Sequence, residues 1–129
     1  MGSDRISEIS EAVLAFRDER DWAQFHTLRK LITSLNLEAA ELLEHTQWLD
    51  DDEIERLARD PAGRQALGEE CADVLLYLLL IAERAGIDLA AATWDKLASN
   101  AQRYPVALAH GSREKYTRLR KRAGTTGAD

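Results

Sequence analysis

Two pairs of acidic residues interrupt the apolar faces of two predicted helices, and this pattern constrains the fold more than any other feature of the chain. Glu38 and Glu41 form the first pair, in LITSLNLEAAELLEH, and Glu70 and Asp73 form the second, in EECADVLLYLLLIA. At 100° per residue, Glu38 falls inside the leucine stripe of its helix, and Glu70 lies in line with valine, tyrosine and isoleucine side chains. Two long antiparallel helices with these pairs on their inner faces would bring all four acids to one site.

Four carboxylates that point into a helical core repel one another and are costly to remove from water, so a cation must lie among them. Oxygen ligands from acidic side chains suit Mg²⁺ best, with Mn²⁺ as the alternative. One acidic pair at this spacing is weak evidence, because such pairs are common on solvated helix faces. A buried ion pair with Arg29 or Arg64 would explain one inward acid but not four. The pattern therefore favours a metal site between helices.

The composition favours an all-α fold of the four-helix-bundle type. Among 129 residues, 45% are apolar and only two are prolines and seven glycines, which leaves long stretches without helix breakers. This length predicts a single domain, expected over residues 1–121, followed by a disordered tail over residues 122–129. The net charge of -6 argues against a general nucleic-acid binder. The lone cysteine, Cys71, excludes an intramolecular disulfide.

No membrane segment is expected from the sequence. The longest apolar run, over residues 74–82, is much shorter than the roughly 20 residues that cross a bilayer. The polar beginning of the chain lacks the apolar region of a secretory signal. We therefore expect a cytoplasmic protein.

Capping signals predict the first two helices and a short segment after them. Ser3 or Asp4 can cap a first helix that runs to about residue 17. A second, long helix is expected from residue 22 or 24 to residue 48. The acidic run that follows it closes this helix and caps a short segment over residues 53–59.

Stronger signals mark the next two helices. Asp60 and Pro61 form a clear helix start, and this helix is expected to run until it stops at Gly86. Asp88 can cap a further helix, which must end near residue 104 because Pro105 follows.

Three polar residues of this last helix, Lys96, Asn100 and Arg103, follow one another at i, i+4 and i+7. Asn100 shares its face with leucine and tyrosine side chains, so we expect it to point inward. Its amide can donate to a carboxylate or bind an ion through its oxygen. Lys96 and Arg103 belong either to the same set or to a solvated face.

Two tryptophans, Trp22 and Trp48, bracket the long helix that carries the first acidic pair. They could sandwich a flat ring between them, or they could pack in the core. His26 could act as a ligand or a base, or it could be a hydrogen-bonded packing residue. The sequence contains no glycine-rich phosphate loop, no Ser/His/Asp or Cys/His set and no zinc-ligand spacing.

The string ERDWAQFHTLRKLITSLNLEAAELLEHTQW, residues 19–48, resembles the all-α nucleoside triphosphate pyrophosphohydrolases of the MazG-like superfamily, and most of all their dCTP pyrophosphatase branch. The resemblance continues through EECADVLLYLLLIAERAGIDL, KLASNAQRYP and GSREKYTRL, so it extends over most of the chain. It includes the ExxE and ExxD motifs that define the superfamily. Members of the branch can carry a histidine near the base at a position where this chain has Val13.

This resemblance implies that the chain hydrolyses a nucleoside triphosphate between its α- and β-phosphates, giving the monophosphate and pyrophosphate. It also implies that the four acids Glu38, Glu41, Glu70 and Asp73 bind Mg²⁺. Glu41 is the first candidate, and Glu38 the second, for the residue that would orient the attacking water or accept its proton. The implied substrate contacts are Trp22 and Trp48 at the base and Tyr77 near the sugar or metal, with His26 as a further candidate. At the phosphates they are Lys96, Asn100 and Arg103. Lys115 and Tyr116 would belong to a tail that closes over the triphosphate.

The resemblance further implies a homo-oligomer, either a dimer or a dimer of dimers, with apolar helix faces at the interface. Two alternatives remain open at the level of the sequence. One is a related activity, on dUTP, on phosphoribosyl-ATP or on a broad range of triphosphates, because base choice depends on a few pocket contacts. The other is a non-catalytic helical module that binds a metal or a protein partner.

Overall fold

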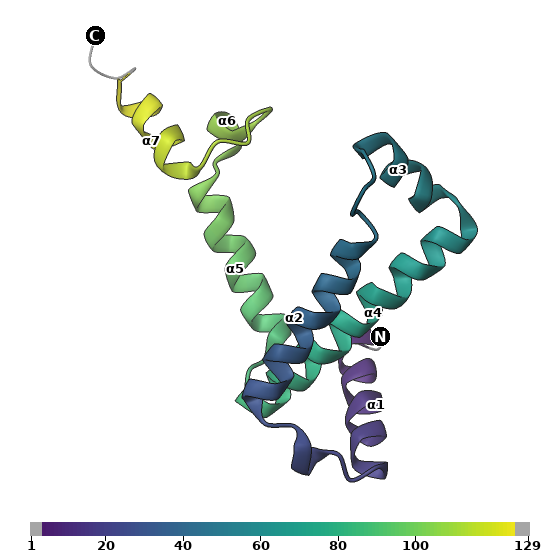
Figure 1. Ribbon diagram of the computed structural model, residues 1–129. Helices are drawn as coiled ribbons and strands as arrows, with labels where there is room; N and C mark the ends of the chain where they lie inside the picture. Colours follow the sequence, from purple (N-terminus) through teal and green to yellow (C-terminus); the bar gives the residue numbers. More distant parts are fainter. Residues whose placement is uncertain (1–3, 126–129) are drawn as a thin grey trace. The chain divides into compact units, whose positions relative to one another are not determined.

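The computed structural model describes residues 4–125, without the side chains of residues 116 and 122–125. Within these residues, every regular element is a helix. This confirms the predicted all-α class. The chain divides into two compact units, Met1–Asp88 and Leu89–Asp129, and the predicted single domain over residues 1–121 stays a prediction. The first unit contains α1 (Arg5–Glu19), a 3₁₀ turn η1 (Ala23–Phe25), α2 (Leu28–Glu44), α3 (Asp51–Arg59) and α4 (Pro61–Ala85) (Figure 1). The second unit contains α5 (Leu89–Arg103), α6 (Val106–Ala109) and α7 (Tyr116–Thr125).

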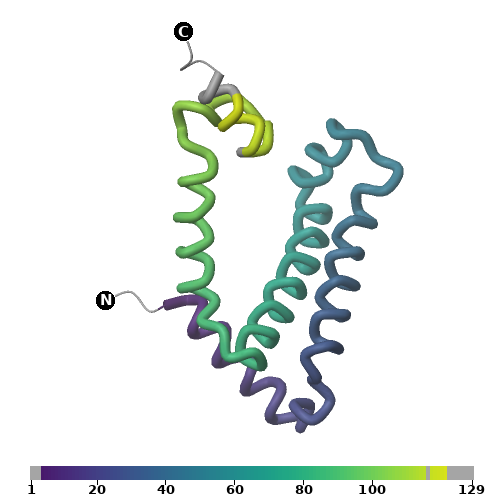
Figure 2. Tube along the Cα trace, turned by 90° about the vertical axis from the view of Figure 1, so that its left-hand side faces the viewer, coloured from purple at the N-terminus to yellow at the C-terminus, as the bar shows by residue number. Residues whose placement is uncertain are grey.

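An antiparallel pair of long helices, α2 and α4, forms the centre of the first unit, as expected from the two acidic motifs. These helices make the most extensive contact between elements, and they run side by side in both views (Figures 1 and 2). The short helix α3 joins them and packs on α4, and α1 packs on α4 as well. The buried apolar side chains of this unit come from α2 and α4: Leu31, Leu79, Leu80 and Ala82.

The ends of α4 lie where the sequence predicts them, because strong local signals fix both. The carboxylate of Asp60 accepts a hydrogen bond from the Gly63 N–H at 3.1 Å, and Pro61 occupies the first turn, where no N–H is needed. At the other end, Gly86 has φ 67°, a left-handed conformation that glycine adopts without a steric penalty. The Ile87 N–H then donates to the Ala82 carbonyl at 2.8 Å, which closes the helix.

The helix α2 is shorter than predicted at both ends. Thr27 begins it, because the Thr27 hydroxyl oxygen accepts a hydrogen bond from the Lys30 N–H at 3.2 Å, and the preceding residues form the separate turn η1. At its other end the Thr46 hydroxyl donates to the Leu43 carbonyl at 2.7 Å. Trp48 follows with φ 71°, outside any right-handed helix. The expected continuous helix to residue 48 is therefore wrong.

In the second unit, α5 ends at Arg103, as the following proline predicted. The helices α6 and α7 pack together, and Leu119 of α7 is buried. The helix α7 continues through residues 122–125, where the sequence predicted a disordered tail, and residues 126–129 lie outside the described residues. Within residues 4–125, no helix has the length and apolar character needed to cross a membrane.

Candidate active site

Three carboxylates from facing helices form a compact cluster in the first unit. Glu38 and Glu41 of α2 and Glu70 of α4 each contribute one oxygen atom to a set whose members lie within 4.8 Å of one another. Glu38 and Glu70 are partly buried, whereas Glu41 is exposed. One oxygen of Glu38 and one of Glu70, Oε2 in each case, is buried without a hydrogen-bond partner among the described residues. Such unsatisfied buried oxygens are rare in proteins, and a bound cation or an ordered water would satisfy them.

The electrostatics of the cluster favour a cation. Burial is the largest cause that raises the pKa of Glu38, and contact with the Glu41 side chain and the negative charges of its neighbours raise this pKa further. The pKa of Glu70 is also raised, first by burial and then by Glu41 and Asp73. The surrounding protein therefore does not balance the negative charge of these two side chains.

A histidine that the sequence analysis did not select lies beside the cluster. His45 Nε2 is 4.0 Å from Glu70 Oε1. A positive charge on His45 lowers the pKa of Glu70 and so opposes the causes that raise it. His45 is the C-cap of α2 and lies four residues after Glu41, so helical spacing alone would have placed it on the same face as the acids.

The fourth predicted ligand, Asp73, is not part of the 4.8 Å set. It lies one turn after Glu70 on α4, and its negative charge raises the pKa of both Glu38 and Glu70. Carboxylate oxygens at this spacing suit a hard divalent cation such as Mg²⁺ or Mn²⁺. The unpartnered oxygens and this donor set fit the predicted metal.

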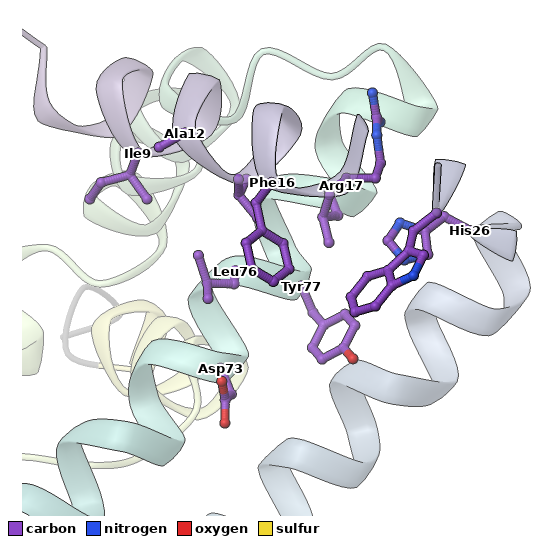
Figure 3. A pocket seen from close by; sticks show the side chains of 11 residues that line it. Ile9, Ala12, Phe16, Arg17, His26, Asp73, Leu76 and Tyr77 are labelled. Carbon is purple, nitrogen blue, oxygen red and sulfur yellow. The ribbon is translucent and has the colours of Figure 1, made fainter. Parts of the chain in front are cut away.

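A pocket of about 460 Å³ adjoins the acidic cluster through Asp73, which contributes to its lining. Its walls come from α1, from α4 and from the segment between α1 and α2 (Figure 3). In Figure 3, Phe16 projects from α1 toward Leu76 and Tyr77 of α4. The lining residues are Ile9, Ala12, Val13, Phe16, Arg17, Trp22, His26, Asp73, Leu76, Tyr77 and Leu80.

The aromatic side chains make this pocket suitable for a flat ring. Trp22 and Phe16 meet edge to face, with ring centroids 5.7 Å apart and planes at 75°. His26 Nδ1 is buried and has no hydrogen-bond partner among the described residues. Burial, helped by the positive charge of Arg17, lowers the pKa of His26, so its imidazole is neutral at pH 7. A mostly apolar pocket with one unsatisfied polar atom is typical of a small-molecule site.

The two predicted base-contacting tryptophans do not meet in one chain. Trp22 lies before α2 and Trp48 lies after it, and a helix of 17 residues is about 25 Å long. Trp22 lines the pocket, whereas Trp48 is 90% exposed. A sandwich of one base between both rings would therefore require Trp48 from a second chain.

The predicted phosphate-binding residues belong to the second unit. Lys96 and Asn100 share one face of α5, where they line a shallow depression of about 360 Å³, and Arg103 is the last residue of this helix. Lys115 is exposed just before α7. Tyr116 begins α7, and its side chain lies outside the described part of the structure. The contact of these residues with a triphosphate stays a prediction.

Sequence comparison assigns this helical fold to a family. The model of the MazG-like family matches residues 33–119, and the chain belongs to this family. This agrees with the resemblance seen in the sequence. The matched region includes both acidic motifs.

Curated relatives carry one shared name. The dCTP pyrophosphatase 1 proteins of Rattus norvegicus and Mus musculus are each 45% identical over 114 residues, which cover 88% of this chain and 67% of the relative. The Homo sapiens protein of the same name is 42% identical, with the same coverage of both chains. Among solved structures, a pyrophosphatase from Archaeoglobus fulgidus superposes with a TM-score of 0.72 at 36% identity, over 81% of this chain and 96% of the other.

Proposed function

We propose that this chain is a metal-dependent nucleoside triphosphate pyrophosphohydrolase that acts on dCTP or a modified dCTP and releases the monophosphate and pyrophosphate. One observation carries the proposal: the cluster of Glu38, Glu41 and Glu70, with its unpartnered buried oxygens, adjoins an aromatic pocket through Asp73. A base in the pocket and a triphosphate at the acids would form one continuous site. The shared name of the relatives, dCTP pyrophosphatase 1, supports dCTP as the substrate.

The acids would hold Mg²⁺, for which Mn²⁺ could substitute. When bound, the cation supplies charge neutralisation for the triphosphate and activation of water at the α-phosphorus. Glu38 and Glu70 are the partly buried members of the set, so we assign them to metal binding. Glu41 is exposed and therefore accessible to water, which favours it as the residue that orients the attacking water or accepts its proton.

The pocket would position the base and exclude water from it. Trp22 offers an aromatic face beside Phe16, and Tyr77 lines the pocket one helical turn after Asp73 on α4. His26 offers a polar atom that could bond to the base edge. Val13 adds an apolar side chain to the lining, so its contact with the base would be steric.

We propose that the working form is a homo-oligomer, a dimer or a dimer of dimers. Apolar side chains of α1 remain exposed in one chain, including Ile6, Ile9 and Phe16. Trp48 is exposed as well, on a segment with a left-handed backbone conformation that is costly for a non-glycine residue. Association of copies would bury such surfaces, and it could bring Trp48 of one chain to the pocket of another.

Pyrophosphate release from a panel of nucleotides tests this function. The panel contains dCTP, 5-methyl-dCTP, dUTP, dTTP and ATP, each with Mg²⁺ or with a chelator, and the proposal expects metal-dependent release that is fastest with the two cytosine nucleotides. A preference for dUTP, or similar rates with all nucleotides, would support the proposed reaction but contradict dCTP as the preferred substrate. No release from any nucleotide would favour a non-catalytic binding module.

The matched variants are Glu70→Gln and Glu44→Gln. Glu70 belongs to the cluster, whereas Glu44 is an exposed acid of α2 that is not part of it. Loss of one ligand should lower the rate on the order of a hundredfold or more. The Glu44 variant should retain the activity of the unchanged chain.

A further inference from the structure

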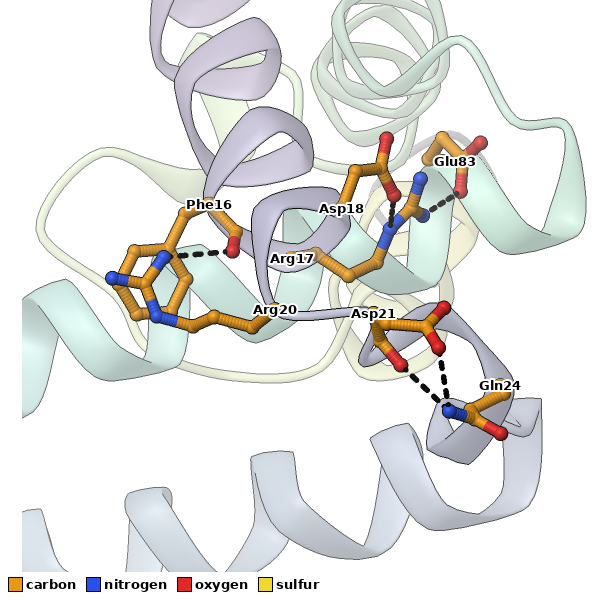
Figure 4. A network of polar contacts seen from close by, with 7 residues as sticks. All are labelled: Phe16, Arg17, Asp18, Arg20, Asp21, Gln24 and Glu83. Carbon is orange, nitrogen blue, oxygen red and sulfur yellow. Dashed lines mark hydrogen bonds and ion pairs between the residues drawn. The ribbon is translucent and has the colours of Figure 1, made fainter.

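Arg17 joins the two helices that form the walls of the pocket. Its Nη1 donates to Glu83 Oε2 of α4 at 3.0 Å, and its Nε donates to Asp18 Oδ1 at 2.8 Å (Figure 4). Only 15% of the Arg17 side chain is exposed, although both acidic partners are more open to solvent. The hydrogen bonds and the shielding of the guanidinium define the geometry of this contact between α1 and α4.

The backbone of the same residue holds the segment that carries Trp22. The Trp22 N–H donates to the Arg17 carbonyl oxygen at 3.0 Å. Asp21, immediately before Trp22, has φ 52°, which turns the chain sharply after α1. The segment that carries Trp22 is therefore held by the backbone at the end of α1, and the Arg17 side chain holds this end of α1 against Glu83 of α4.

The charge of Arg17 also acts on the second polar feature of the pocket. Arg17 and His26 both line it, and the positive guanidinium disfavours a proton on the imidazole. The other titratable groups that line this pocket are Asp73 and Tyr77, both on α4. A neutral His26 keeps one ring nitrogen as a hydrogen-bond acceptor, whereas a protonated ring could only donate.

We propose that Arg17 is a positioning residue of this pocket: its side chain holds the end of α1 on Glu83, and this end of α1 in turn holds the segment that carries Trp22. This proposal rests on the proposed function, because it assigns the pocket to the nucleotide. The hydrogen bonds of the Arg17 side chain go to Glu83 and Asp18, neither of which belongs to the acidic cluster. Its loss should therefore weaken substrate binding and leave the chemical step largely intact.

The test replaces Arg17 with Met, which retains the apolar stem and removes the charge and the hydrogen bonds. With dCTP and Mg²⁺, Arg17→Met should raise KM about tenfold, as expected for a lost charge-assisted contact, and change kcat by less than about twofold. Arg17→Lys keeps the charge and should restore part of the affinity. Arg84→Met is the matched control, because Arg84 is an exposed arginine near the end of α4 that lines neither pocket.

Two measurements do not depend on turnover, so they separate this proposal from the proposed function. NMR titration of His26 in the protein without nucleotide should show protonation at higher pH in Arg17→Met, but at the original pH in Arg17→Lys. Quenching of tryptophan fluorescence by dCMP should require more ligand in Arg17→Met. If Arg17→Met does not fold, Glu83→Ala removes the acceptor of the same hydrogen bond and should raise KM without an equal loss of kcat.

An unchanged His26 titration together with an unchanged KM would overturn the proposal. Parallel losses of kcat, stability and affinity in Arg17→Met that Arg17→Lys does not rescue would also overturn it, since they would indicate a merely structural role. Absence of turnover in the unchanged protein, with the expected His26 and dCMP results, would reject the catalytic function and keep the role of Arg17.

Discussion

Glu38 of α2 and Glu70 of α4 approach within 4.8 Å through carboxylate oxygens, and each retains a buried oxygen without a hydrogen-bond partner in the described chain. Two acids placed in this way destabilise the folded protein when both are ionised, because burial and mutual repulsion oppose their charges. A bound divalent cation would reverse this effect. The arrangement is therefore best explained by ligand binding and not by stability of the fold.

The variant Glu38→Gln should separate the effect of charge repulsion on stability from the effect of metal binding. Without metal, the variant should be at least as stable as the unchanged protein, since it removes one charge from the cluster. With Mg²⁺ at about a hundred times its Kd, the unchanged protein should gain about 2.7 kcal/mol of stability, whereas Glu38→Gln should not. Thermal unfolding with Mg²⁺ and with chelator measures this, with Glu44→Gln as the control. An equal Mg²⁺-induced shift in Glu38→Gln would remove Glu38 from the metal site.

His26 should make stability depend on pH below neutrality. Its pKa in the folded protein is lower than the ordinary value of 6.5, mainly through burial. As the pH falls below 6.5, the unfolded chain takes up a proton at this residue while the folded chain does not, so the free energy of unfolding decreases. The decrease continues until the pH reaches the lower pKa of the folded state. Urea unfolding between pH 7.5 and 5 should show a flatter profile in His26→Gln, and identical profiles would contradict this prediction.

Gly63 should be essential to the contact between α3 and α4. It is buried, and a Cβ atom at this position would overlap the Leu57 carbonyl oxygen and side chain. Gly63→Ala should therefore destabilise the protein by about 1–3 kcal/mol. Gly68 lies on the same helix with open space around it, so Gly68→Ala should stabilise by about 0.5–1 kcal/mol through helix propensity alone. Chemical denaturation gives the free energy of unfolding of both variants. An unchanged free energy of unfolding in Gly63→Ala would mean that α3 packs differently.

Trp48 provides a test for a site shared between chains. Trp48→Ala should raise KM for dCTP, and Glu70→Gln should lower turnover on the order of a hundredfold or more. If Trp48 acts on the pocket of a second chain, a mixture of the two variants should form some sites with an intact cluster and an intact Trp48. At low dCTP, this mixture should then exceed the summed activities of its separate components. No gain after demonstrated subunit exchange would place Trp48 outside the substrate site, and a mass of 14.5 kDa in sedimentation would exclude a stable oligomer.

Local signals in the sequence were sufficient for much of the fold. The Asp60-Pro61 start and the Gly86 end of α4 depend on neighbouring backbone groups, so they could be predicted without tertiary information. The limits of α2 could not, because residues 22–48 form a pattern without helix breakers that contains neither proline nor glycine. The Thr27 cap and the left-handed Trp48 end the helix against that pattern.

The same distinction applies to the candidate site. Helical periodicity placed Glu38, Glu41 and Glu70 on facing sides of two helices, and the structure brings these three together. The pocket was less predictable, because its geometry depends on the contact of α1 with α4. The Arg17–Glu83 pair, whose members are far apart in the sequence, leaves no periodic trace.

The products formed from dCTP test the central claim most directly. Phosphorus NMR of dCTP incubated with the protein and Mg²⁺ should show dCMP and pyrophosphate in equal amounts, with no dCDP. Neither product should form with chelator, and both should form much more slowly with Glu70→Gln. Formation of dCDP and orthophosphate would contradict cleavage between the α- and β-phosphates. Unchanged dCTP under conditions where the protein is folded and binds Mg²⁺ would contradict the assignment of dCTP as the substrate.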